Sequence, residues 1–170
     1  MALETVSVTE RITPQLGQES AWDYPRPPIA VPAGRHVRVV FAGQLIAETR
    51  RPIKVMETSH PPVYYLPLDD VAREVLRSSP HATVCEFKGV ARYYHVVLGR
   101  HRAENAAWYY PEPDPGYELL RGYVSFYPRL MDEITLDGEP VLPQPGGFYG
   151  GWVTSEVVGP FKCTPGAPDL

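Results

Sequence analysis

The chain has 170 residues, enough to bury a sizeable core, and we expect one domain. Its 16 basic and 20 acidic residues leave a net charge of −4, which argues against a nucleic-acid binder held by a basic surface. The sequence also holds 20 prolines and 11 tyrosines, and so many prolines favour short strands and ordered loops over long helices.

The two cysteines, Cys85 and Cys163, are too few for a disulfide framework or a zinc site built from four thiolates. We therefore predict no metal site, and the sequence assigns no cofactor. It shows no secretory leader and no apolar run of membrane-spanning length. We expect a cytoplasmic protein with reduced thiols whose partners include neither nucleic acid nor membrane.

The domain boundaries follow from changes in composition along the chain. Residues 1–21 are polar and lack periodicity, so we predict an N-terminal arm. Residues 22–163 are predicted to form a single β-rich domain, and residues 164–170 a C-terminal tail. The segments 22–28 and 146–163 carry several large aromatic side chains, so we expect both to pack on the body.

Alternating apolar and polar residues predict strands through most of the chain. Two hairpins are indicated, one around Ala42-Gly43-Gln44 and one around Asp137-Gly138. The predicted strands are 37–41, 45–49, 53–58, 63–66, 95–98, 123–127, 134–136, 141–142 and, near the end, 153–158.

One short helix is predicted at about 69–78. Leu68, Val71, Val75 and Leu76 fall on one helical stripe, and Asp69 or Asp70 would cap its start. A further helical turn is indicated around 118–121. The predicted fold is therefore mainly β, with two packed antiparallel sheets or an open barrel and one short helix.

The stretch 83–94 lies at the centre of the predicted sheet region. It is either one strand bent at Gly89 or two strands that meet at Lys88-Gly89. Both alternatives place an amine beside a residue with unusual backbone freedom, because glycine has no side chain to restrict its angles. The stretch therefore indicates a candidate pocket.

Three separated motifs carry a family resemblance. They are Thr83-x-Cys85-x-x-Lys88-Gly89-x-Ala91-x-Tyr93, then Ala107-Trp108-x-Tyr110-Pro111-x-Pro113, then Phe126-Tyr127, with Glu57-x-x-His60-Pro61-Pro62-Val63-Tyr64-Tyr65 upstream. Over about residues 35–142 the chain resembles the family catalogued as domain of unknown function 427 (DUF427), although Glu86 stands where the pattern has proline. The resemblance implies a small β fold of two sheets with a short helix, and a nucleotidyltransferase-like label.

Three polar residues are the candidates for chemistry. Lys88 could meet a phosphate or carboxylate, or lie in a solvated turn. Glu57 could act as a general base or bind a sugar, or it could pair with Arg50 or Arg51. His60 could be catalytic or a loop residue.

Cys85 could be a nucleophile or a small buried apolar residue. The tyrosine-rich aromatic set could stack on a ligand ring or fill the core. Its members are Tyr65, Tyr93, Trp108, Tyr110 and Tyr127. We expect Lys88, Glu57 and these aromatic residues to converge on one cavity, with an ion pair or a water-filled cleft between the two charges.

Three functions are compatible with these residues. The first is a domain that binds a small ring-containing anion in an aromatic pocket. The second is a transferase or hydrolase in which Glu57 acts as base and Lys88 stabilises negative charge. The third is a protein-interaction domain whose Trp-Tyr-Pro segments form an adhesive surface. The oligomeric state stays open, with a homodimer as one option.

Overall fold

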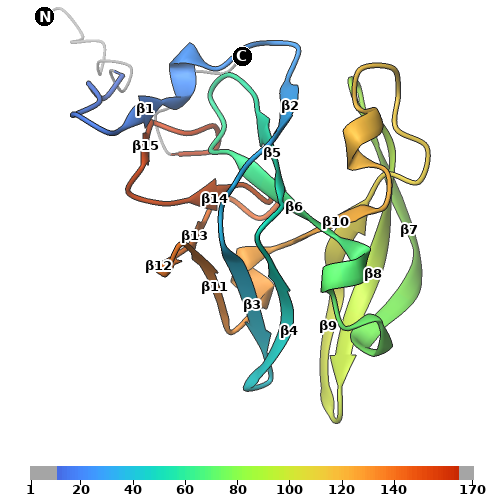
Figure 1. Ribbon diagram of the computed structural model, residues 1–170. Coiled ribbons are helices and arrows are strands. Elements are labelled where there is room, and N and C mark those ends of the chain that lie inside the picture. Colours follow the sequence, from blue (N-terminus) through green and yellow to red (C-terminus); the bar gives the residue numbers. More distant parts are fainter. Residues whose placement is uncertain (1–10, 165–170) are drawn as a thin grey trace, which may run out of the picture.

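The computed structural model describes residues 11–164, in which the strands form four sheets and none closes into a barrel (Figure 1). This mainly β architecture confirms the predicted fold class. The larger of the two main sheets has seven strands and the smaller has four, and all their pairings are antiparallel. Residues 1–10 of the predicted arm and residues 165–170 of the predicted tail lie outside the described residues.

In sheet order the seven strands are β2 (Ile29–Pro32), β5 (Ile53–Met56), β6 (Val63–Pro67), β10 (Tyr123–Phe126), β9 (His101–Tyr109), β8 (Gly89–Leu98) and β7 (Leu76–Cys85). The four-stranded sheet contains β12 (Glu139–Pro140), β11 (Glu133–Leu136), β3 (Val37–Phe41) and β4 (Gln44–Thr49). Two small sheets pair β1 (Glu19–Ser20) with β15 (Val157–Val158), and β13 (Leu142–Pro143) with β14 (Trp152–Val153).

Both predicted hairpins are present. The β3–β4 turn places Ala42 and Gly43 at φ +50° and +75°, and the β11–β12 turn places Asp137 and Gly138 at φ +48° and +83°. Two successive positive φ angles match the backbone twist of flanking strands, which explains why these dipeptides join them.

The helix predicted at 69–78 is wrong. The segment contains two short 3₁₀ turns, η2 (Leu68–Asp70) and η3 (Arg73–Val75), and its last residues already belong to β7. The Ala72 N–H donates to the carbonyl of Ile46 at 2.8 Å, and Val71 bridges Ala47. These bonds to β4 replace the i−4 bonds that a helix would need.

The remaining short turns are also of the 3₁₀ type. They are η1 (Ala21–Asp23), η4 (Glu118–Leu120), which confirms the predicted helical turn, and η5 (Pro128–Leu130). Within residues 11–164 no helix is long and apolar enough to cross a membrane.

The central stretch consists of two strands, as the second alternative proposed. β7 ends at Cys85, which pairs with Gly89 at the start of β8. Gly89 has φ +108°, and a Cβ there would lie 3.2 Å from a carboxylate oxygen of Asp114. Glycine is therefore required at this position by conformation as well as by space.

The middle strands of the seven-stranded sheet, β6 and β10, are buried on both faces. Along β6, Tyr64 and Leu66 join the large core shared with the four-stranded sheet, whereas Tyr65 points to the opposite face. There it joins a second apolar cluster that includes Trp108 and Tyr93. This second face supplies the wall of the pocket described below.

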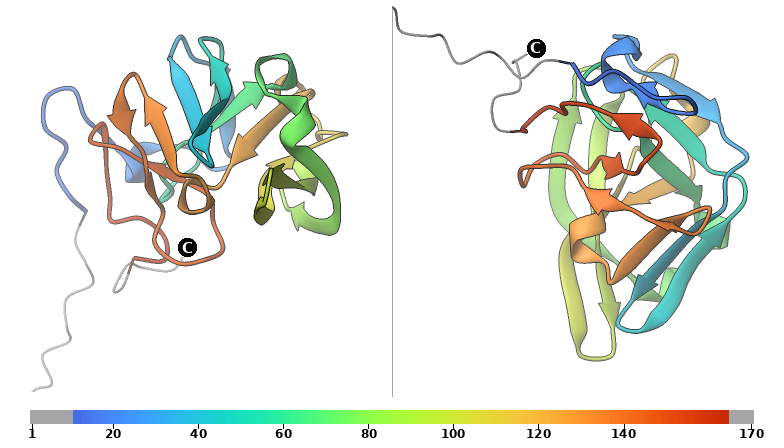
Figure 2. Two further views of the ribbon diagram at one scale, coloured as in Figure 1. Left: turned by 90° about the horizontal axis from the view of Figure 1, so that it is seen from below. Right: turned by 90° about the vertical axis from the view of Figure 1, so that its left-hand side faces the viewer.

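The first and last described segments lie side by side, as Figure 2 shows. β1 runs parallel to β15, and the indole N–H of Trp22 donates to the carbonyl of Pro160 at 2.9 Å. Trp22, Tyr24 and Trp152 are all buried, as expected for packed segments, whereas Phe148 is 69% exposed.

Candidate functional site

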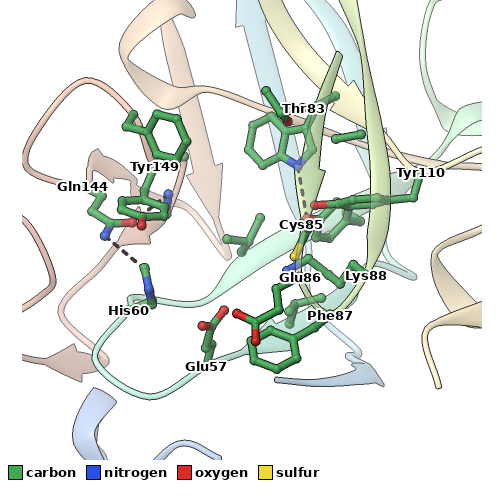
Figure 3. A pocket seen from close by; sticks show the side chains of 18 of the residues that line it. Glu57, His60, Thr83, Cys85, Glu86, Phe87, Lys88, Tyr110, Gln144 and Tyr149 are labelled. Atoms are coloured by element: carbon green, nitrogen blue, oxygen red, sulfur yellow. Dashed lines mark hydrogen bonds between the residues drawn. The ribbon is translucent and has the colours of Figure 1, made fainter. Parts of the chain in front are cut away.

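A cavity of about 330 Å³ lies against the second face of the seven-stranded sheet (Figure 3). All nine residues singled out in the sequence line it. They are Glu57, His60, Tyr65, Cys85, Lys88, Tyr93, Trp108, Tyr110 and Tyr127. Tyr65, Tyr93 and Trp108 come from β6, β8 and β9 of this sheet and share its second face. The other residues lie at or just beyond the ends of its strands.

The aromatic wall is held by specific contacts. The Trp108 indole N–H donates to the Tyr65 hydroxyl at 3.1 Å, and the Trp108 and Tyr127 ring centroids are 4.6 Å apart. Between β7 and β8, the Thr83 hydroxyl lies 2.8 Å from the Tyr93 hydroxyl. Rings fixed in this way present flat surface to a ligand without losing further side-chain freedom on binding.

Burial raises the pKa of Tyr65 and of Tyr110, and the charge of an ionised Cys85 nearby would raise both further. Burial likewise raises the pKa of Tyr127. These hydroxyls therefore stay protonated at neutral pH and remain able to donate hydrogen bonds.

Lys88 is buried, with only 8% of its surface exposed. Its Nζ lies 5.9 Å from the centre of the Tyr110 ring, within cation–π range. Lys88 forms no ion pair within the part of the chain that the structure describes. The solvated-turn alternative is therefore wrong for this side chain.

Glu57 pairs with a residue that the sequence did not suggest. Its carboxylate lies 3.6 Å from the guanidinium of Arg26, whereas Arg51 contacts Asp70 at 3.5 Å. The expected partners Arg50 and Arg51 are thus incorrect, and so is a direct pair with Lys88. Arg26 belongs to the N-terminal segment that packs on the body, and it also lines the cavity.

A second polar group lies on the other side of the cavity, built around Gln144. Its Oε1 accepts from the Gly151 N–H at 3.2 Å. Its Nε2 donates to the Lys162 carbonyl at 3.1 Å and lies 3.3 Å from Nδ1 of His60. The Tyr149 ring packs edge-on against His60, with centroids 4.7 Å apart.

Burial lowers the pKa of His60, and the positive charges of Lys162, Lys88 and Arg26 lower it further, while Glu57 opposes them. His60 is therefore neutral at physiological pH.

Sequence reasoning missed the residues that the C-terminal part of the chain contributes. We call residues 144–151 the closing segment. Gln144 and Tyr149 of this segment, together with Lys162, line the cavity. Only Gly150 and Gly151 carried a signal, because glycines among aromatic residues are typical of close backbone approach. A Cβ on Gly150 would lie 2.8 Å from Cζ3 of Trp108, so the segment rests directly on the aromatic wall.

The lining carries more positive than negative groups. Arg26, Lys88 and Lys162 face two carboxylates, Glu57 and Glu86. Arg26 and Glu57 offset each other, and Glu86 is exposed. Cys85 is partly exposed at the edge of the cavity. Among residues 11–164 no three His, Cys, Asp or Glu side chains are grouped to hold a metal ion.

A protein-family model described as "Domain of unknown function (DUF427)" matches residues 29–137, from β2 to the β11–β12 turn. No curated protein matches the chain. The matched range includes Lys88 and the aromatic wall, and it ends before the closing segment and Lys162.

Proposed function

The chain belongs to the DUF427 family, and from its pocket we propose that the protein binds a small anionic molecule that contains a flat ring. The ring would lie against Trp108 and Tyr127, and an acidic group would meet Lys88. Flat aromatic walls with a few fixed polar groups are typical of small-molecule sites.

The observation that carries this proposal is the buried Lys88 side chain, which lines the cavity beside the aromatic wall. Removing an ammonium from water costs several kcal/mol unless another charge or hydrogen bonds offset it. Within residues 11–164 no carboxylate pairs with it. An acidic group on a ligand would provide that charge, in a site where water screens it poorly.

The concave shape favours this function over an adhesive surface. The aromatic residues Tyr65, Trp108 and Tyr127 are each no more than 9% exposed and line a cavity. A protein-interaction site would instead present a contiguous apolar patch to solvent.

The test is a thermal-shift screen of aromatic carboxylates, nucleotides and sugar phosphates, followed by calorimetric titration. A ligand at one hundred times its Kd stabilises the folded state by about 2.7 kcal/mol, which corresponds to a rise in Tm of roughly 5 to 10 °C for a chain of this size. We expect anionic ring compounds to produce this shift and their neutral amides to fail.

Lys88→Met keeps the length of the side chain and removes its charge. It should weaken binding of the best compound at least tenfold and leave the Tm of the free protein within a few degrees. Lys54→Met is the matched control, because Lys54 pairs with Glu19 and lies outside the cavity. Equal affinity of the Lys88 variant and the control would refute the proposal, as would a screen in which no anionic ring compound binds.

A further inference from the structure

The orientation of the Gln144 amide is fixed by its partners. The Gly151 N–H can only donate, so the atom it contacts must be the amide oxygen. The Lys162 carbonyl can only accept, so it must face the amide nitrogen. The same nitrogen therefore donates to Nδ1 of His60, at 3.3 Å.

This arrangement decides which His60 nitrogen carries the proton. An Nδ1 atom that accepts a hydrogen bond has no hydrogen of its own, so the neutral imidazole is protonated at Nε2. No partner for Nε2 is present among the described residues, although His60 itself lines the cavity. His60 thus offers the pocket one N–H donor, held in a defined direction by Gln144.

The side chain of Lys162 lies on the same side of the cavity as the His60 imidazole, and both contact the Tyr149 ring. Nζ of Lys162 lies 5.2 Å from the centre of the Tyr149 ring, and that ring packs against His60. Lys162 is half-buried and, like Lys88, forms no ion pair in the range 11–164. A charged group and a neutral donor on one side of a cavity form a second place for an acidic group.

The His60 imidazole and the Lys88 side chain lie on opposite sides of the cavity. Figure 3 shows His60, Gln144 and Tyr149 on one side and Lys88 with Tyr110 on the other. The aromatic wall formed by Trp108 and Tyr127 contributes to the same cavity.

We propose that the ligand is a flat ring compound with two separate acidic groups. One group binds Lys88, and the other binds Lys162 and the Nε2–H of His60. This inference rests on the proposed function and narrows its ligand class from a ring-containing anion to a cyclic or aromatic diacid. Gln144 is a positioning residue, because it acts through His60.

The experiment compares phthalate, isophthalate and terephthalate, each with its own monoamide, by calorimetric titration of the full chain. The monoamides keep the ring and one carboxylate and lose only the second charge. We expect at least one diacid to bind the wild-type protein tenfold or more tightly than its monoamide. Lys162→Met should remove this advantage and leave the affinity for the monoamide within about twofold.

The outcomes separate the two proposals. If monoamides bind through Lys88 but no diacid binds more tightly, or if Lys162→Met retains the advantage, the second acidic site is refuted and the proposed function stands. If neither diacids nor monoamides bind, the diacid proposal fails, whereas the proposed function fails only if the wider screen of aromatic carboxylates, nucleotides and sugar phosphates also finds no anionic ring compound that binds.

Gln144→Leu tests the positioning role. The imidazole nitrogen chemical shifts of His60, measured by NMR, should indicate the Nε2–H form in the wild-type protein and a mixture of both neutral forms in the variant. The variant should also show a smaller difference in affinity between the diacid and its monoamide than the wild-type protein does. Unchanged chemical shifts in the variant would refute the role of Gln144.

Discussion

Replacing Gly150 by alanine tests whether the closing segment is seated on the aromatic wall. The backbone of Gly150 passes over the six-membered ring of Trp108. An added methyl group would lie 2.8 Å from Cζ3 of that ring and 3.0 Å from Cε1 of Tyr127, and closer still to Cη2 of Trp108. Contacts this short do not occur between real atoms, so one of the partners must move.

Neither partner moves freely. Trp108 is buried and its indole N–H is bonded to Tyr65. The end of the closing segment is held by the next residue, Trp152, whose backbone N–H donates to the Pro62 carbonyl at 2.9 Å. Overpacking of this kind costs about 1 to 3 kcal/mol. For a protein of this size the expected fall in Tm is roughly 2 to 12 °C.

The matched control is Gly147→Ala, three positions before Gly150 in the same segment. A Cβ on Gly147 would meet nothing within 4 Å, and its φ lies outside the left-handed region. Its effect should stay within about 0.5 kcal/mol. Urea unfolding followed by tryptophan fluorescence measures both variants, and equal stability of the two would show that the segment does not rest on Trp108.

Three further predictions concern the fold and its pH dependence. Gly89→Ala should cost about 1 to 3 kcal/mol, because φ +108° strains any other residue, whereas Gly34→Ala, with free space and no positive φ, should be near neutral in the same urea titration. Trp152→Phe should cost about 2 to 4 kcal/mol, since it leaves the buried Phe126 carbonyl without its 3.1 Å donor and opens a cavity; a Tm equal to that of the wild type would contradict this. The lowered pKa of His60 means that the unfolded chain takes up a proton first as pH falls below 6.5, so stability is lost there at about 1.4 kcal/mol per pH unit until the folded protein also binds the proton. His60→Gln should therefore lose less Tm between about pH 7.5 and 5.5 than the wild type does, and equal losses would rule out His60 as the cause.

Local sequence signals predicted most of the strands because each depends on a few neighbouring residues. The dipeptides Ala42-Gly43 and Asp137-Gly138 favour the positive φ angles of tight hairpins, and both form them. The helix at 69–78 failed for the opposite reason. Val71 and Val75 are buried, as expected for the apolar face of the predicted helix. The Ala72 N–H, however, bonds to β4, and the local sequence pattern does not predict a contact with that distant strand.

The pocket was predictable only in part. Residues on adjacent strands share a face at regular intervals, so Tyr65, Tyr93 and Trp108 could be expected to meet. The bond between Gln144 and His60 joins residues 84 positions apart, and no turn motif or periodicity in the sequence predicts this contact. Lys162 is likewise placed by the packing of the chain's last described segment, and no pattern around it indicates a role.

The pairing of the first and last described segments also sets the order in which the molecule can be completed during synthesis. Contacts between distant residues form slowly, since a long loop must first be closed, and Trp22 bonds to Pro160 across 138 positions. While a ribosome is still adding the closing segment, β2 to β11 can already pair, but Trp108 is not yet covered by Gly150 and His60 lacks Gln144. The two main sheets can therefore form before the cavity, whose lining is complete only after Lys162 has emerged.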